Sequence, residues 1–282
     1  TGMEQQDILS MTLPELQAAV QELGEPKFRA KQIFNWLHQK RVTDFSEMTT
    51  LSLPFRERLA SDFCINRLKI AKRLASSVDD TVKYLYELPD GNYVETVCMQ
   101  YHHGTSLCIS TQVGCRMGCR FCASAIAGFV RNLTPAEMLL QIYETERAQN
   151  CKISSLVLMG IGEPLDNFDN VLRFLQLLSD PNGYGMSLRH VTVSTCGVVP
   201  KILELAEQRL GLTLSVSLHC PNDAGRSAIM PINRSYPIDV LLDACQTYFE
   251  KTGRRVTFEY AVMDQVNSAE QDAAALAERL KG

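Results

Sequence analysis

The stretch Leu107-Cys-Ile-Ser-Thr-Gln-Val113, continued by Gly-Cys115-Arg-Met-Gly-Cys119-Arg-Phe-Cys122, decides the fold of this chain. Its first half is typical of a strand, and its second half places three cysteines within eight residues, spaced C-x3-C-x2-C. Three thiolates do not complete a tetrahedral zinc site, which normally takes four protein ligands. They can hold three corners of a cubane [4Fe–4S] cluster and leave one iron open to a small molecule. The sequence therefore predicts cluster ligands at Cys115, Cys119 and Cys122.

The spacing by itself leaves two other interpretations of these cysteines. One is a zinc knuckle whose fourth ligand lies elsewhere in the chain, and the other is three unrelated buried thiols. We favour the cluster because the segments downstream carry matching signals for a ligand site.

Composition is that of an ordinary globular protein. Of the 282 residues, 45% are hydrophobic and 21% are charged, which is enough chain for one large domain and a small one. No apolar run is long enough to span a membrane, and the N-terminus lacks the basic and apolar regions of a signal peptide. Seven of the ten cysteines are scattered without a framework spacing, which favours a reducing compartment, so we expect a cytoplasmic protein and no membrane partner.

Charge is unevenly distributed along the chain. The segment from Pro26 to Arg73 contains eleven Lys and Arg residues and four acidic residues. Its net charge is therefore +7, in a chain whose total is −4. A basic segment on an acidic body is typical of a protein that docks a polyanion, and nucleic acid is the first candidate. The alternative is a solvated helical face without a partner.

The first 104 residues are predicted to form two segments. Residues 1–73 are expected to be a helical accessory domain, because their apolar residues recur with a helical period. Gly24 is expected to end the first of these helices. Residues 74–104 are expected to be a β-hairpin linker, since alternating runs at 82–88 and 93–99 flank Asp90-Gly91, a turn signal. Glu95 lies in the second of these strands.

From about residue 105 the chain alternates between strand and helix patterns. Strands are expected near 107–113, 154–160, 190–196, 212–219 and 255–263. Helices are expected near 134–149, 167–179, 198–209 and 236–252, with a last one from about 268. Such alternation indicates parallel strands with crossover helices, and so an α/β sheet or barrel over 105–282.

Small polar residues follow the expected strands. Gly162 and Glu163 come after the second strand, Ser194 ends the third, and Ser217 and His219 end the fourth. The carboxyl ends of parallel strands meet at one mouth, so these residues are candidates for a single ligand site. A histidine alone is more often structural, and only its position at a strand end favours a site role for His219.

Together these pieces resemble one family, the radical S-adenosylmethionine (SAM) adenine-C2 methyltransferases of 23S rRNA and tRNA. The aromatic Phe121 between the last two cysteines matches the radical SAM signature. The resemblance rests on segments 24–33, 94–97, 112–123, 128–133, 159–165, 191–195, 217–219, 230–233 and 266–267. It implies a partial (β/α) radical SAM barrel preceded by the helical domain and the hairpin linker. A C8-methylating antibiotic-resistance relative is the alternative, and Glu163-Pro164 favours C2 chemistry.

The resemblance also implies cofactors, site residues and partners. A [4Fe–4S] cluster on the three cysteines would bind SAM, and the SAM pocket would be lined by Gly162, Glu163, Ser194, Ser217, Leu218 and His219. The substrates would be 23S rRNA and tRNA, and the electron donor a protein such as flavodoxin or ferredoxin.

The chemistry that the resemblance implies uses a radical because adenine C2 is too electron-poor for polar methylation. A methyl group carried on a C-terminal cysteine loses a hydrogen to the SAM-derived radical and then adds to the base. Glu95 matches the acid that removes the C2 proton, and Cys108 matches the thiol that releases the base with formation of a disulfide. From the residues alone, Cys108 reads as a buried strand residue and Glu95 as an exposed hairpin acid.

One departure from the family pattern concerns the end of the sequence. The chain ends at Lys281-Gly282, before the sixth strand and the methyl-carrying cysteine that the resemblance implies. The expectation is therefore a truncated member that binds cluster and SAM without methylating RNA. Two other classes remain open, an RNA-binding accessory protein without catalysis and a radical SAM enzyme that acts on a protein or small molecule.

Overall fold

The computed structural model describes residues 4–281. Within it the chain forms two compact units, each made of several segments. The first unit comprises residues up to Ile109, Leu133–Ser155 and Asp169–Ser187, and the second comprises Ser110–Asn132, Leu156–Phe168 and residues from Leu188 onward. In the described part of the chain, every helix falls short of the length and hydropathy that a membrane span requires.

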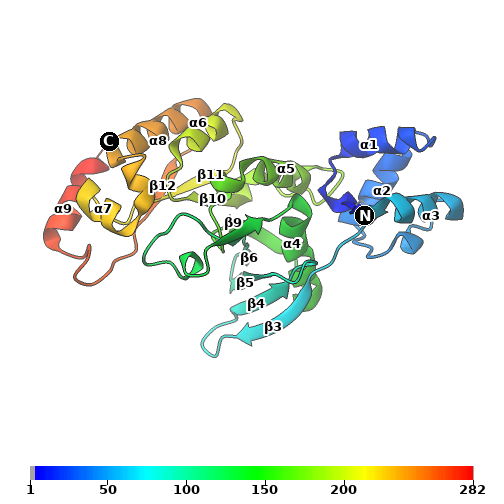
Figure 1. Ribbon diagram of the computed structural model, residues 1–282, viewed down its shortest axis with the longest axis horizontal. Coiled ribbons are helices and arrows are strands. Elements are labelled where there is room, and N and C mark those ends of the chain that lie inside the picture. Colours follow the sequence, from blue (N-terminus) through cyan, green and yellow to red (C-terminus); the bar gives the residue numbers. More distant parts are fainter. Residues whose placement is uncertain (1–3, 282) are drawn as a thin grey trace. The chain divides into compact units, whose positions relative to one another are not determined.

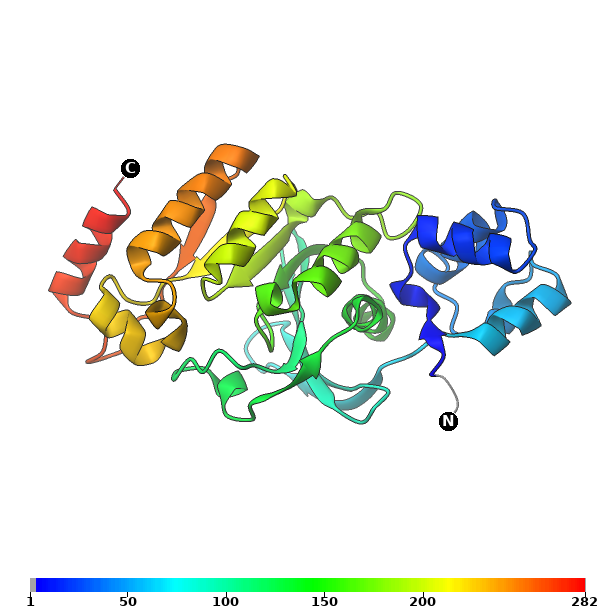
Figure 2. The same ribbon diagram turned by 45° about the horizontal axis from the view of Figure 1, so that its top comes forward.

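The N-terminal part of the first unit is helical, as the apolar period predicts. Its helices are α1 (Leu13–Glu22), α2 (Arg29–His38) and α3 (Leu53–Asp62), and short strands β1 (Gln6–Asp7) and β2 (Phe63–Cys64) pair beside them. Thr12 and Glu15 form a capping box that begins α1, and the Ser52 hydroxyl accepts the Phe55 N–H to begin α3. α1 and α2 pack side by side (Figure 2) and bury Leu16, Val20, Ile33, Phe34 and Leu37.

The first unit also holds an antiparallel sheet in the order β3-β4-β5-β6. Its strands are β3 (Lys69–Ala75), β4 (Val82–Glu87), β5 (Tyr93–Tyr101) and β6 (Gly104–Cys108). The predicted hairpin is confirmed, because β4 and β5 flank a turn in which the Gly91 N–H donates to the Leu88 carbonyl and Gly91 has φ +85°. The helical prediction was wrong from Lys69 onward. β3 is exposed along its whole length, so no buried apolar side chains determine its conformation. It is a strand because its backbone pairs antiparallel with β4.

Helix α4 (Pro135–Gln149) lies against the buried face of β4 and β5 in the first unit. The Tyr86 hydroxyl is 2.7 Å from the Thr145 hydroxyl, and the Thr96 hydroxyl donates to Gln141 Oε1 at 2.8 Å. A continuous run of α4 is buried, from its first residue to Glu146. Burial on all sides explains why this helix carries little amphipathic pattern.

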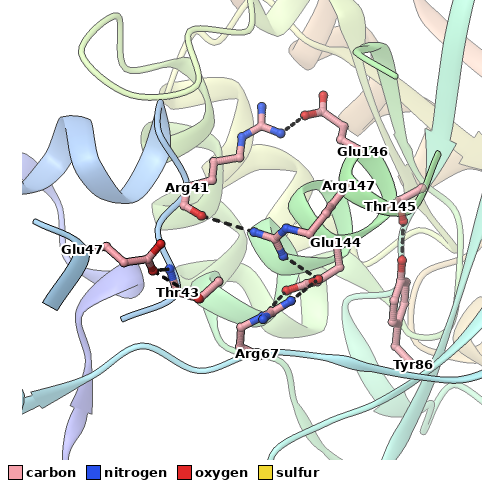
Figure 3. Close-up of polar contacts among 9 residues, drawn as sticks. All are labelled: Arg41, Thr43, Glu47, Arg67, Tyr86, Glu144, Thr145, Glu146 and Arg147. Atoms are coloured by element: carbon pink, nitrogen blue, oxygen red, sulfur yellow. Dashed lines mark hydrogen bonds and ion pairs between the residues drawn. The ribbon is translucent and has the colours of Figure 1, made fainter. Parts of the chain in front are cut away.

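Ionic contacts join α4 to the segments that enter and leave α2 and α3 (Figure 3). Arg67 donates to both oxygens of Glu144, at 2.7 and 3.0 Å, and Arg147 donates to Glu144 and to the Arg41 carbonyl. Arg41 pairs with Glu146. Burial raises the pKa of Glu144, but the hydrogen bonds from the two arginines outweigh it and hold that pKa below its ordinary value. The bidentate pair between Arg67 and the buried Glu144 carboxylate therefore holds the segment after α3 against α4.

Asp7 in the first unit makes stability depend on pH. Burial raises its pKa from 3.8 to about 6, although its side chain accepts the Leu9 N–H and caps the short helix Ile8–Ser10. A raised carboxyl pKa means that the folded state holds the proton more tightly. Stability from this group is therefore present below pH 3.8 and is lost as the pH rises through about 6.

Asp7→Asn is expected to stabilise the protein at pH 7.5 and to change little at pH 4. Asparagine keeps the cap without the buried charge, so the gain at pH 7.5 is at most about 3 kcal/mol. Urea unfolding of both proteins at the two pH values measures it. An equal difference at both values would contradict the argument.

The second unit contains four parallel strands in the order β12-β11-β10-β9. The strands are β9 (Ile153–Leu158, of which Leu156–Leu158 belong to this unit), β10 (Val191–Thr195), β11 (Thr213–Ser217) and β12 (Val256–Glu259). Helices α6 (Val199–Glu207) and α8 (Ile238–Thr252) pack side by side (Figure 1), and α7 (Asp223–Ile229) and α9 (Glu270–Arg279) follow β11 and β12. Among the described residues, β12 ends this set of strands without closure. The predicted α/β class and partial barrel are confirmed.

Two details differ from the predicted elements. The run 107–113 is not one parallel strand, because β6 ends at Cys108 and pairs antiparallel with β5, while β7 (Gln112–Gly114) pairs antiparallel with β8 (Phe129–Asn132). The chain turns between them. There the Ser110 hydroxyl accepts the Ile161 N–H, and the Thr111 and Gln112 N–H groups donate to the Ile161 carbonyl. Helix α7 was not predicted. It has seven residues and begins where the Asn222 side chain accepts the Gly225 N–H.

Candidate functional site

A cavity of about 300 Å³ lies at the carboxyl ends of β9, β10 and β11 in the second unit. The three cysteines predicted as cluster ligands line it together with residues from each of these strand ends. Its walls include Cys115, Cys119, Phe121, Cys122, Met159, Gly162, Glu163, Ser194, Cys196, Ser217, His219, Met230 and Glu259. The structure thus brings together every residue predicted for the cluster and the SAM pocket except Leu218. The Leu218 side chain is fully buried, and its N–H donates to the Glu259 carbonyl.

The cysteine loop is held to the end of β9 by a polar network. Gln112 Nε2 donates to Asn132 Oδ1 and Asp166 Oδ2, both at 2.9 Å, and Arg116 Nε lies 2.7 Å from the same Asp166 oxygen. The Glu163 N–H in turn donates to Gln112 Oε1 at 2.9 Å. The loop is therefore anchored at its entry to the segment that carries Glu163.

Gly162 allows β9 and the cysteine loop to approach this closely. Its φ is +109°, and a Cβ there would lie 2.6–2.9 Å from atoms of Gln112. Both the conformation and the space exclude a side chain. Backbone can therefore approach a ligand on this wall of the cavity.

Glu163 places a buried carboxylate in the wall of the cavity. Its Oε1 accepts the Leu165 N–H at 3.1 Å and its Oε2 accepts the Cys196 N–H at 2.8 Å. Burial raises the pKa of this carboxyl, and the hydrogen bonds from Cys196, Thr195 and Leu165 oppose that rise. Such a group, fixed by backbone donors, is suited to accept hydrogen bonds from an ammonium ligand.

His219, which lines the same cavity, is held in a strained conformation. Its φ is +59°, and Asn267 Nδ2 donates to its carbonyl at 2.6 Å. Nδ1 accepts the Ala261 N–H at 2.8 Å, so in the neutral ring the hydrogen is assigned to Nε2. The ring meets Phe121 edge-on, with centroids 4.8 Å apart. A non-glycine residue in this conformation is typical of a ligand site.

The donor set of the cavity fits an iron–sulfur cluster. Cys115, Cys119 and Cys122 are half-buried thiols that share one wall, and within residues 4–281 no three His, Cys, Asp or Glu side chains gather around a single point as one metal ion requires. A cubane [4Fe–4S] cluster takes one thiolate at each of three irons, and these three half-buried thiols can supply them. Burial raises the pKa of Cys119 to about 11, the neighbouring Cys115, Cys122 and Glu163 add to that rise, and the charge of Arg226 opposes it.

Glu95 and Cys108, the predicted proton acceptor and resolving thiol, belong to the first unit. Cys108 is the register partner of Val97, and Glu95 lies two residues from Val97 on β5. Both side chains therefore project from the same face of the sheet, in the diagonal relation in which neighbouring strands bring long side chains together. Lys83 Nζ lies 2.7 Å from Glu95 Oε1 on this face.

The disulfide named among the expectations is not seen, because none of the ten cysteines, each of them a described residue, is joined to another by a disulfide bond. Cys98 on β5 lies one residue beyond Val97, the register partner of Cys108, and is itself paired with Leu107. Its side chain therefore points to the opposite face of the sheet from Cys108.

Residues without a predicted role also shape the cavity. Gln112, Asp166, Asn267 and Arg226 hold its loops through side-chain hydrogen bonds. The first and third stand inside segments that carried the resemblance, but nothing in their spacing identified the atoms that they bind.

Comparison with known proteins agrees with this geometry. The family described as the ribosomal RNA large subunit methyltransferase N-terminal domain matches residues 6–65, and the radical SAM superfamily matches residues 109–277. A probable dual-specificity RNA methyltransferase RlmN from Lachnoclostridium phytofermentans is 51% identical over 99% of this chain and 78% of its own length. The protein of the same name from Alkaliphilus oremlandii is 50% identical over 99% of this chain and 81% of its own length.

A solved structure is similar over the same extent. The crystal structure of a radical SAM methyltransferase from Sphaerobacter thermophilus matches with a TM-score of 0.93 and 39% sequence identity, covering 98% of this chain and 82% of that one. The matches to both family descriptions and to full-chain relatives leave one assignment: this chain belongs to the RlmN family of radical SAM RNA methyltransferases.

Proposed function

We propose that the protein methylates the C2 carbon of adenine in 23S rRNA and tRNA, using SAM and a [4Fe–4S] cluster. The observation that carries the proposal is the single cavity in which three cysteines face Glu163, Ser194, Ser217 and His219. The relatives named as dual-specificity RNA methyltransferases support the substrate class. The chemistry that a cluster and SAM supply at such a site is reductive formation of a carbon radical, which an electron-poor C2 carbon requires.

Each wall of the cavity has a proposed role. Cys115, Cys119 and Cys122 bind three irons. Glu163 accepts hydrogen bonds from the SAM ammonium, and the backbone at Gly162 lies against the methionine part. The hydroxyls of Ser194 and Ser217 make polar contacts with the carboxylate and the ribose of SAM. The Nε2–H of the His219 ring supplies a further donor to these groups. Leu218 is proposed to act by holding the end of β11 in place, since its side chain is buried, its N–H donates to the Glu259 carbonyl and its carbonyl accepts Arg226 Nε.

Glu95 and Cys108 are proposed to act on the RNA base. The Glu95 carboxylate takes the C2 proton, and Lys83 Nζ lies 2.7 Å from its Oε1. The Cys108 thiolate would attack the sulfur of the methyl-carrying cysteine that the family resemblance implies after Gly282, so that an S–S bond forms as the bond from that sulfur to the methyl carbon breaks and the methylated base is released. Their common face on β5 and β6 supports a joint role.

We propose that the segments divide this work among three domains. Residues 1–73 bind RNA, residues 74–104 form the linker that carries Glu95, and residues 105–282 hold cluster and SAM. The net charge of +7 between Pro26 and Arg73 supports the first assignment. A low-potential protein such as flavodoxin or ferredoxin is proposed to supply the electron.

The function is tested with anaerobically reconstituted protein, extended after Gly282 by the C-terminal segment of a relative that carries the methyl-bearing cysteine, and with 23S rRNA and tRNA from cells that lack the modification. We expect 2-methyladenosine in digests of the treated RNA, measured by mass spectrometry. Appearance of 8-methyladenosine instead would favour the C8-methylating alternative. RNA binding without iron or SAM uptake would favour the non-catalytic one.

A further inference from the structure

Arg226 on α7 is a fully buried cation, with none of its side chain exposed. Its guanidinium has four hydrogen-bond acceptors, and all of them are neutral oxygens. Nη2 donates to the carbonyls of Cys196 and Ser217 at 2.6 and 2.8 Å, Nε donates to the Leu218 carbonyl at 3.1 Å, and Nη1 donates to Asn233 Oδ1 at 3.1 Å. A buried arginine without a carboxylate in direct contact is costly, so the fold has to compensate for it.

The carbonyls that Arg226 binds lie at the ends of two strands that form the cavity. Cys196 follows β10, and Ser217 and Leu218 end and follow β11. Ser194, Cys196, Ser217 and His219 on these same ends line the cavity. Because one planar guanidinium binds carbonyls from both ends at once, it fixes the spacing between them.

The segment that carries Arg226 also contacts the cysteine loop. The Arg120 N–H donates to the Ile229 carbonyl at 2.9 Å, and Met230 lines the cavity. On the far side, Asn233 Nδ2 donates to Asp223 Oδ1 at 3.0 Å, so the amide of Asn233 bridges Asp223 and Arg226. One short segment therefore connects the strand ends, the cysteine loop and a remote negative charge.

The charge of Arg226 opposes that of the cavity wall, which holds three thiols and the Glu163 carboxyl. A cluster held by three thiolates carries net negative charge, and it gains more when it is reduced. A buried cation behind this wall favours the reduced state because little water screens it.

We propose that Arg226 is a positioning residue of the cofactor cavity, with two separable actions. Its planar fork sets the distance between the ends of β10 and β11 and so shapes the SAM pocket, and its charge raises the reduction potential of the cluster. This inference rests on the proposed function, since it presumes that cluster and SAM occupy the cavity.

Two substitutions separate the two actions. Arg226→Lys keeps the charge and loses the fork, whereas Arg226→Gln loses both. We expect the Lys variant to bind SAM roughly tenfold more weakly or worse, with an unchanged midpoint potential, because buried charged hydrogen bonds are lost. The Gln variant is expected to show the weaker binding together with a more negative potential. Equilibrium dialysis of SAM and a redox titration followed by electron paramagnetic resonance measure the two quantities.

Arg234→Gln is the matched control, since it removes a cation from the same segment at an exposed position. It should leave SAM affinity and potential unchanged. Wild-type affinity in the Lys variant would overturn the role of the fork, and this test stands even if the Gln variant fails to fold. A wild-type potential in a folded Gln variant would overturn the role of the charge. Wild-type protein that takes up no iron or SAM would instead refute the proposed function.

Discussion

Cys119→Ala is expected to reduce the iron content of anaerobically reconstituted protein from about four atoms per chain to nearly none. Two thiols do not retain a cubane in a half-exposed loop, so SAM binding and RNA methylation should fall below detection with it. Iron quantitation and the visible absorbance of the cluster measure the first effect, and mass spectrometry of the RNA measures the last. Because the Cys119 thiol is only half-buried, the variant should still fold.

Cys64→Ala is the matched control for this experiment. Cys64 is also a free, half-buried thiol, but it lies on β2 in the first unit. Its removal should leave the iron content at the wild-type value. A Cys119→Ala variant that kept its iron would remove the basis of the cluster assignment.

Glu95→Gln is expected to lower methylation of C2 by about 10²- to 10⁴-fold, the range that a proton-transfer group contributes. Glutamine keeps the shape of the side chain but does not accept the proton. Iron content and SAM affinity should not change, because Glu95 lies on β5 and is not among the residues that line the cofactor cavity. Methylated product is measured together with SAM binding in the same preparation.

Glu87→Gln provides the comparison. Glu87 ends β4 and projects from the same face of the sheet, and the substitution removes the same charge. It should leave methylation within a few-fold of wild type. Equal losses from both variants would assign the effect to the charge of this face rather than to Glu95, and the proposed role would then be wrong.

The sequence predicted those parts of the fold that local chemistry determines. The Asp90-Gly91 turn defines its hairpin without help from the rest of the chain, and the spacing of strands and helices after residue 150 gives β9 to β12. The run 107–113 was misread because an apolar segment looks alike in parallel and antiparallel sheets. Its break at Ser110 depends on a hydrogen bond to Ile161, 51 residues away.

The residues of the candidate site could be predicted from the sequence to a similar degree. Strand ends predicted where Ser194, Ser217 and His219 would meet, because parallel strands share an edge. The contacts of Arg226 could not be predicted, since its partners include main-chain carbonyls, one of them 30 residues earlier, and every residue type has such a carbonyl. Sequence alone also gives no sign that a given arginine is buried.

Strand β3 has a consequence for the behaviour of the protein at high concentration. It is the last strand on its side of the sheet, and all seven of its residues are exposed. An unprotected border of this kind attracts a second molecule, which can continue the ladder and begin an aggregate. Lys69, Lys72 and Arg73 lie along it, and their mutual repulsion between two copies keeps molecules apart. The same cations that suit a polyanion therefore also protect the protein from self-association.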